Sequence, residues 1–253
     1  MTGNLVLLRH GESTWNQANL FTGWHDVPLS DKGVSEATAA GVTMRDAGLR
    51  FDFGHTSLLE RVVVTAHLAL TSLGQVWLPL QRSWRLNERH YGALQGLDKQ
   101  ETTARHGAEQ TLLWRRSYNV PPPPVDAGHP EHPANDARYA QLPPDVLPAS
   151  ECLRDVVARV LPYWHDQVAP QLMAGLNVLV VAHGNSLRAL VKHLEDVSDD
   201  EIADLNIPTG VPRRYCLSER LLVTDVAYLG DQDLIAAATV AVARQASSTK
   251  SVI

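Results

Sequence analysis

The chain has 253 residues, of which 44% are hydrophobic and 20% are charged, and its net charge is −6. These values are ordinary for a globular protein, so they exclude a disordered, collagen-like or coiled-coil chain, and the acidic balance argues against a nucleic-acid-binding surface. The apolar runs are too short to cross a membrane, and the first residues lack the basic start of a secretory signal. Two cysteines cannot build a disulfide scaffold, so we expect a cytoplasmic protein. From the charge and the short apolar runs we expect it to bind neither nucleic acid nor membranes.

The first part of the chain alternates short apolar runs with amphipathic stretches. Continuous apolar runs such as Leu5 to Leu8 predict buried strands, whereas apolar residues at helical spacing predict helices. In chain order, these patterns predict a strand over 5–8, a helix over 31–48, a strand over 51–55, a helix over 59–73, a strand end over 76–80, and helices over 98–106 and 109–118. Thr56 or Ser57 can cap the helix that starts at residue 59.

A proline-rich segment divides the chain. Nine of the 15 prolines lie between Pro121 and Pro148, which indicates an extended insertion, either a linker or a cover over a site. The most regular apolar stripe comes next and predicts a helix over 150–172, which Pro162 should kink. After it, the patterns predict a buried strand over 177–182, a helix over 187–194, a short helix from 198, antiparallel strands over 215–217 and 221–228, and a last helix over 234–246.

Strands that alternate with helices predict an α/β fold with a mostly parallel sheet. The elements on either side of the proline-rich segment are not self-contained. We therefore expect a single domain over residues 1–253 with an insertion near 120–149. The Ser-rich end of the chain, residues 247–253, is expected to be mobile.

Two of the predicted strands end in the same way, with histidine and glycine after the apolar run. Arg9-His10-Gly11 follows the first strand, and His183-Gly184 follows the strand over 177–182. Because ligands of open α/β sheets bind beyond the carboxyl ends of strands, these pairs should meet at one edge. The histidines are either structural turn residues, metal ligands or catalytic groups. A metal would need a third ligand and would be repelled by Arg9, whereas arginine suits phosphate, so we predict no metal.

The roles that we expect for the other charged residues depend on where they lie in the predicted fold. Arg61 is near the start of the helix that follows the second strand, at the same predicted edge. The segment Leu86 to Gly96 has no hydrophobic period and many hydrogen-bonding groups, which indicates an ordered functional loop whose one carboxylate is Glu88. Bound phosphate would favour protonation of Glu88, which suits a general acid and base, although a surface pair with Arg89 explains it equally well. By itself, the pair Arg115-Arg116 indicates a solvated helix face.

These residues lie within longer stretches that closely resemble the cofactor-dependent phosphoglycerate mutases of the histidine phosphatase superfamily. The resemblance covers nearly the whole chain, and its block most specific to the mutase branch is Leu86 to Leu97. The strongest stretches are Leu8 to Asn16, Phe21 to Trp24, Leu29 to Ala37, Leu86 to Leu97, Trp114 to Arg116, Ala182 to Val191 and Asn206 to Pro212. The match is loose over 121–148, and Arg213-Arg214 stands where relatives are more apolar.

The resemblance implies a three-layer sandwich, with a mixed, mostly parallel sheet between helices, and the interconversion of 3-phosphoglycerate and 2-phosphoglycerate. His10 would carry the phosphoryl group, and Glu88 would be the general acid and base. His183, Arg9 and Arg61 would stabilise the phosphoryl group during transfer. The compound 2,3-bisphosphoglycerate would be both the cofactor that primes His10 and the intermediate. The positions expected to hold the phosphate or carboxylate ends of the substrate are Asn16, Thr22, Gly23, Tyr91, Lys99, Arg115, Arg116, Gly184 and Asn185.

Two activities of the same superfamily stay open: a histidine phosphatase, and a bisphosphoglycerate mutase or phosphatase. Lys99, Arg115 and Arg116 suit a second anionic end of the substrate, which favours the phosphoglycerate mutase. A binding protein with an inactive site would have lost His10 or Glu88, and neither is lost. A mutase must also keep water from the phosphohistidine, and the proline-rich insertion or the C-terminal tail is the expected cover. The resemblance further implies a homodimer or homotetramer whose only other partners are small phosphoglycerates.

Overall fold

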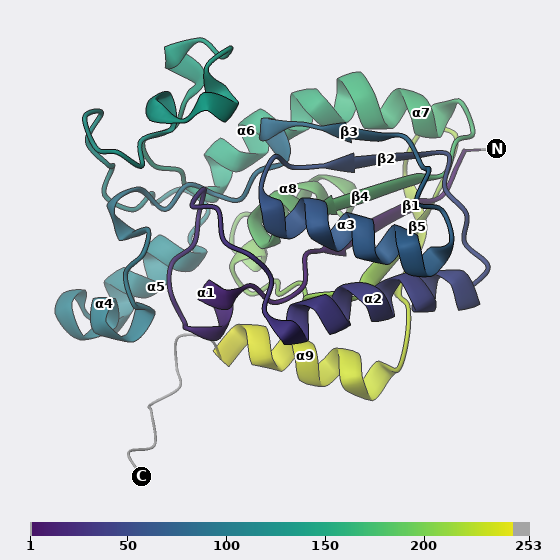
Figure 1. The fold of residues 1–253 in the computed structure, drawn as a ribbon, viewed down its shortest axis with the longest axis horizontal. Coiled ribbons are helices and arrows are strands. Elements are labelled where there is room, and N and C mark those ends of the chain that lie inside the picture. The colour runs from purple at the N-terminus through teal and green to yellow at the C-terminus, as the bar shows by residue number, and fades with distance from the viewer. Residues whose placement is uncertain (1, 245–253) are drawn as a thin grey trace.

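The computed structural model describes residues 2–244, except for the side chains of residues 243 and 244. Its centre is a six-stranded sheet with the order β3-β2-β4-β1-β5-β6 (Figure 1). The strands are β1 Leu5–Arg9, β2 Phe53–Thr56, β3 Leu80–Arg82, β4 Val178–Ala182, β5 Pro212–Leu217 and β6 Val223–Tyr228. The first four in chain order run parallel to one another, and β5 and β6 are antiparallel to their neighbours. The predicted mixed, mostly parallel sheet is confirmed.

The two central strands are buried on both faces, because every residue of β1 and β4 is inaccessible to solvent. Leu5 pairs with Val178 and Arg9 with Ala182, so the two strands end level with each other. Alternate residues of β1 serve opposite layers: Leu5 and Leu7 belong to one hydrophobic cluster and Val6 and Leu8 to the other. This register places the residue after each strand at the same edge of the sheet.

Helices cover both faces of the sheet, as the sandwich requires. On one face lie α6 Leu153–Tyr163, α7 Ala169–Met173 and α8 Gly184–Leu194, and on the other lie α2 Asp31–Asp46 and α3 Glu60–Leu73. In Figure 1, α6 and α7 run above the strands, and α2 and α3 run below them. The remaining helices are α1 Thr14–Gln17, α4 Lys99–His106, α5 Ala108–Arg116 and α9 Gln232–Arg244. None of the helices in this described part of the chain is long and apolar enough to span a membrane.

Several element boundaries differ from the predictions. The short helix α1 lies in a stretch expected to be loop, where Ser13 and Asn16 cap each other's backbone. The helix α3 begins after Leu59 with no side-chain cap, so the cap predicted from Thr56 or Ser57 is wrong. The long helix expected over 150–172 is divided: a π-helical turn, Trp164–Val168, separates α6 from α7. There the amide of Ala169 donates to the carbonyl of Trp164, five residues back.

The proline-rich segment packs against the loop that precedes α2. It contains three single 3₁₀ turns, Pro133–Asn135, Ala137–Tyr139 and Pro144–Val146. The Tyr139 hydroxyl accepts from Asn87 Nδ2 at 2.8 Å, and its ring lies 4.8 Å from that of Trp24. The segment therefore supports the walls of the site rather than closing it. The expected mobile tail, 247–253, lies outside the described residues.

The unusual pair Arg213-Arg214 lies in β5, and each arginine forms an ion pair within the chain. Arg213 Nη2 donates to both oxygens of Glu195, at 2.7 and 2.8 Å, and Arg214 pairs with Asp225 at 3.2 Å. These contacts account for two arginines where an apolar strand end was expected. The predicted assembly into a homodimer or homotetramer stays a prediction, as does the cytoplasmic location.

Candidate active site

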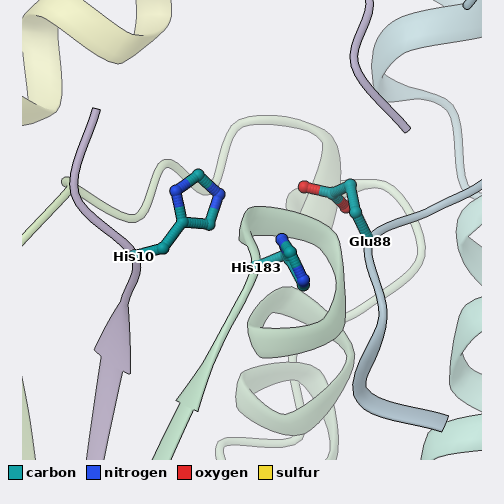
Figure 2. A group of neighbouring side chains, drawn as sticks. All are labelled: His10, Glu88 and His183. Carbon is teal, nitrogen blue, oxygen red and sulfur yellow. The ribbon is translucent and has the colours of Figure 1, made fainter. Parts of the chain in front are cut away.

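The two histidines meet at the carboxyl edge of the sheet. His10 follows β1 and His183 follows β4, and their ring centroids are 5.0 Å apart at an interplanar angle of 65°. Figure 2 shows Glu88 beside them, on a segment that runs alongside the helix that follows His183. Ligand atoms of all three side chains lie within 4.8 Å of one another. Three chain segments far apart in sequence thus place two imidazoles and one carboxylate in a single cluster.

His10 is prepared as a neutral nucleophile. Its Nδ1 lies 2.7 Å from the carbonyl oxygen of Gly11, and because a carbonyl only accepts, Nδ1 carries the proton and Nε2 has the free lone pair. Burial, together with the charges of Arg61 and Arg9, lowers the pKa of His10 well below 6.5. The imidazole is therefore neutral across the physiological pH range, so its Nε2 lone pair is free to attack phosphorus.

The packing of the fold explains why residue 11 is a glycine. A Cβ at this position would lie 2.2 Å from the backbone oxygen of Gly33 in the first turn of α2. By contrast, a Cβ at Gly184 would meet its nearest neighbour, the Arg9 guanidinium, at an ordinary 3.5 Å. The two His-Gly pairs are therefore alike in sequence but differ in how strictly the fold requires the glycine.

His183 is oriented by Ser57, a residue that the sequence interpretation treated only as a helix cap. Ser57 Oγ accepts from the amide of Leu59 at 3.2 Å and lies 2.9 Å from His183 Nε2, so the hydroxyl can donate to that ring nitrogen. A hydroxyl that donates to Nε2 leaves the proton of His183 on Nδ1, an atom that is buried without a hydrogen-bond partner among the described residues. Burial and the charge of Arg61 lower the pKa of His183 well below 6.5. A neutral ring with one free donor suits an incoming phosphoryl oxygen.

The two oxygens of Glu88 have different roles. Oε1 accepts three bonds, from the amide of Arg89 at 2.7 Å, the amide of Asn185 at 3.1 Å and Asn185 Nδ2 at 2.9 Å. No described residue hydrogen-bonds Oε2, which is therefore the oxygen available to a substrate proton. Glu88 is 8% exposed, and the Arg89 guanidinium donates instead to the carbonyl of Arg115 at 2.7 Å. The alternative of a surface pair between Glu88 and Arg89 is wrong.

Arg9 and Arg61 supply positive charge beside the histidines. Arg9 Nη1 donates to the carbonyl of Ile207 at 2.7 Å, and Arg61 donates to the carbonyls of Gly23 and His25 at 2.7 and 3.0 Å. Neither guanidinium forms an ion pair within the described residues. Burial lowers the pKa of Arg61 to about 10, so it stays charged at neutral pH.

A second group of cations lines the same cavity. It consists of Lys99, Arg115 and Arg116, which lie there together with Tyr91 and Asn185. The alternative that Arg115-Arg116 forms a solvated helix face is wrong, because both side chains line the cavity and are only partly exposed. Burial and the neighbouring Arg116 lower the pKa of Arg115 to about 10. Burial and Arg115 lower the pKa of Lys99 to about 7. The lowered pKa values of Arg115 and Lys99 reflect burial next to other positive charges.

Thirteen of the fourteen residues predicted for the site line this cavity, and His183 lies just behind it against His10 and Glu88. The residues that sequence reasoning missed are Leu20, Phe21, Arg188, Leu205, Asn206, Ile207 and Val242. Arg188 and Asn206 fall within stretches that match the mutases, which was the signal available for them. No described residue of the proline-rich segment lines the cavity, whereas Val242 of α9 does.

The charge balance of the cavity favours an anionic ligand. The cations among the described lining residues are Arg9, Arg61, Lys99, Arg115, Arg116 and Arg188, against one carboxylate, Glu88. The atoms of His10, Glu88 and His183 are close enough to hold a metal ion. However, the charges of Arg9 and Arg61 that depress protonation of His10 would also repel a metal cation. The site therefore fits phosphate better than a metal, and a metal-free site stays a prediction.

Comparison with solved structures supports the fold. The chain is 21% identical to a putative α-ribazole-5′-P phosphatase from Escherichia coli K-12, with a TM-score of 0.67, and the match covers 92% of this chain and 98% of that one. It is 24% identical to mycobacterial glucosyl-3-phosphoglycerate phosphatase, with a TM-score of 0.64 over 90% of this chain and 98% of that one. At these identities the likeness is one of fold.

The family follows from the sequence match itself. The model of the histidine phosphatase superfamily (branch 1) matches residues 5–132 and 125–212, which is most of the chain. That range contains both His-Gly pairs and the Glu88 loop whose geometry is described above. The chain belongs to the histidine phosphatase superfamily.

Proposed function

We propose that the protein is a 2,3-bisphosphoglycerate-dependent phosphoglycerate mutase, which interconverts 3-phosphoglycerate and 2-phosphoglycerate through a phosphohistidine at His10. The observation that carries the proposal is the excess of positive charge in one cavity, whose described lining residues include six cations and one carboxylate. Arg9 and Arg61 lie beside the nucleophile, and Lys99, Arg115 and Arg116 line the same cavity. A small substrate with phosphate at one end and carboxylate or a second phosphate at the other would satisfy both groups.

In the proposed reaction, each reacting atom has a role when His10 accepts the phosphoryl group. His10 Nε2 attacks phosphorus, and the bond between phosphorus and the substrate oxygen breaks in line. Arg9, Arg61 and the free Nδ1–H of His183 stabilise the charge on the equatorial oxygens. Glu88 Oε2 gives a proton to the leaving substrate oxygen, so the electron pair of the broken bond ends as a neutral hydroxyl.

The opposite half-reaction comes first in the mutase cycle: the free hydroxyl of 3-phosphoglycerate attacks the phosphohistidine, the bond between phosphorus and His10 Nε2 breaks, and Glu88 Oε2 takes the hydroxyl proton. One carboxyl serves both halves, because the proton moves in opposite directions. The bisphosphate formed between the two halves must reorient within the cavity before its other phosphate returns to His10, for which two groups of cations in one cavity are suited. The same six cations and single carboxylate fit 2,3-bisphosphoglycerate as the phosphate donor that first loads His10.

A histidine phosphatase is the second candidate, and the names of the similar solved structures favour it: both are phosphatases. It would use the same His10 chemistry, with water in place of the second hydroxyl. A phosphatase does not need the additional cations Lys99, Arg115 and Arg116 in the cavity, and for this reason we place the mutase first. A bisphosphoglycerate mutase or phosphatase differs from both only in the ratio of the same steps.

Conversion of 3-phosphoglycerate, followed by phosphorus NMR with and without catalytic 2,3-bisphosphoglycerate, tests the proposal. A mutase gives bisphosphate-dependent 2-phosphoglycerate with little free phosphate. Release of free phosphate without isomerisation makes the protein a phosphatase. His10→Ala is the control: it should abolish labelling of the protein by the bisphosphate, and residual labelling would contradict the role of His10.

A further inference from the structure

Arg188 is a buried cation without an acidic partner among the described residues. It lies on α8, one turn after Asn185, and is 4% exposed. Its Nη1 donates to Asn185 Oδ1 at 2.9 Å, and its Nη2 donates to the carbonyl of Ile202 and, at 3.5 Å, to that of Arg116. Burial, with the like charges of Arg116 and Arg89, lowers its pKa to about 9.

Such a residue is unfavourable for stability alone. A buried charge without a counter-ion has lost its hydration, and an apolar side chain of similar size would avoid that loss. Arg188 also faces other cations across the cavity wall, which adds repulsion. A role in the site, rather than in the core, explains its presence.

Its contacts indicate what that role is. The oxygen and nitrogen of an asparagine amide can exchange places by a half-turn of the side chain. A guanidinium only donates, so Arg188 holds Asn185 Oδ1 toward itself and turns Asn185 Nδ2 toward Glu88 Oε1, 2.9 Å away. Without Arg188, a flipped amide would set its oxygen against the carboxylate oxygen.

We propose that Arg188 is a positioning residue for phosphoryl transfer: it fixes the Asn185 amide, and through it the Glu88 carboxyl, so that Oε1 is saturated and Oε2 alone exchanges the substrate proton. The proposal rests on the role of Glu88 in the proposed function. Nη1 and Nη2 of Arg188 both donate to the protein, and a loss of kcat without a change in KM would distinguish positioning from direct contact with the substrate.

A double-mutant cycle with Asn185 tests this chain of contacts. We expect Arg188→Met to lower kcat about 10- to 100-fold, the loss typical of one hydrogen bond to a charged group, with KM changed by less than about threefold. Asn185→Ala should lower kcat by a similar factor. In the Asn185→Ala background, Arg188→Met should then change kcat by less than about twofold, because its target is gone.

Two further measurements complete the experiment: the unfolding temperature of Arg188→Met, and the kcat of a control variant on the same helix. Arg188→Met should unfold at the same or a higher temperature than the wild type, because a purely structural cation would lower it. Lys192→Met is the control, since Lys192 lies one turn further along α8 and pairs with exposed Asp199 at 2.8 Å; it should keep the wild-type kcat. If Arg188→Met does not fold, Arg188→Lys, which keeps the charge and a donor, enters the same cycle and should recover part of kcat.

The outcomes separate this proposal from the proposed function. Additive losses of kcat in the double variant, or a raised KM with unchanged kcat, overturn the positioning role. Loss of stability in Arg188→Met without a change in kcat overturns it as well. Failure of the wild type to transfer phosphoryl groups at all would instead overturn the proposed function.

Discussion

Two groups of buried arginines lie on opposite sides of the Glu88 loop, and they are held in opposite ways. Behind the loop, Arg159 Nε pairs with Glu151 Oε1 at 2.6 Å, with both side chains less than 10% exposed. Arg159 also donates to the carbonyls of Asn87 and Glu88, each at 2.9 Å, and Glu151 Oε2 accepts from the amide of His90 at 2.8 Å. This pair clamps the backbone that carries Glu88.

In front of the loop, the cations of the cavity lack such partners. Arg9 and Arg61 donate to backbone carbonyls, and burial together with Arg115 lowers the pKa of Lys99 to about 7. Behind the loop, the protein neutralises the positive charge of Arg159 with a carboxylate, whereas the cations in front have no such partner among the described residues and are free to bind an anion. The paired buried arginine is therefore scaffold in this molecule, and the unpaired cations of the cavity, apart from Arg188, form a binding site.

Removing one partner of the buried Arg159–Glu151 ion pair should have the largest effect on stability. Glu151→Ala leaves Arg159 charged and buried, so we expect the free energy of unfolding to fall by about 3–5 kcal/mol. Denaturant unfolding measures it. Asp46→Ala removes an exposed pair with Arg45 and, as the control, should cost less than about 1 kcal/mol. Equal losses in the two variants would refute the distinction between clamp and surface pair.

Removing an unpaired cation should affect binding and spare stability. Lys99→Met relieves repulsion with Arg115, so the melting temperature should stay the same or rise. The KM for phosphoglycerate should increase about 10- to 100-fold, because one charged contact is lost. Lys32→Met, on the exposed start of α2, is the control and should leave KM unchanged. A lower melting temperature with normal KM would place Lys99 in the scaffold.

The same comparison predicts a pH dependence. Because the pKa of Lys99 is lowered to about 7, the ligand-free protein loses this charge as the pH rises through 7. The KM should therefore rise between pH 7 and 9, measured at constant ionic strength. Lys99→Arg keeps its charge over that range, so its KM should be nearly flat. A wild-type profile as flat as that of the arginine variant would show that Lys99 stays protonated.

The smallest expected effect is that of a chelator. If arginines and histidines replace a metal ion in stabilising the phosphoryl group, EDTA should leave the rate of the mutase step unchanged within error. The measurement is the conversion of 3-phosphoglycerate after dialysis against EDTA. Loss of activity that a divalent metal restores would assign the cluster of His10, Glu88 and His183 to a metal instead.

Much of the fold was predictable because it depends on local pattern. Continuous apolar runs identified β1 and β4, and the parallel register then required His10 and His183 to meet. The break within 150–172 was predicted at Pro162, but its form, a π-helical turn before Pro170, was not, because propensity does not specify which carbonyl an amide will choose. The capping of α1 by Asn16 was missed because the same residue was assigned to substrate.

The sequence by itself determined the two strand ends, the chemical types that follow them and, through family resemblance, thirteen of the residues that line the cavity. Only the tertiary structure decided which arginines are neutralised. Arg159 reaches the carbonyl of Glu88 across 71 residues of chain, and Arg9 reaches that of Ile207 across 198. The sequence alone does not distinguish Arg159 from Arg9. Their roles diverge because the packing of α6 pairs Arg159 with a carboxylate, whereas Arg9, at the carboxyl edge of the sheet, forms no ion pair among the described residues.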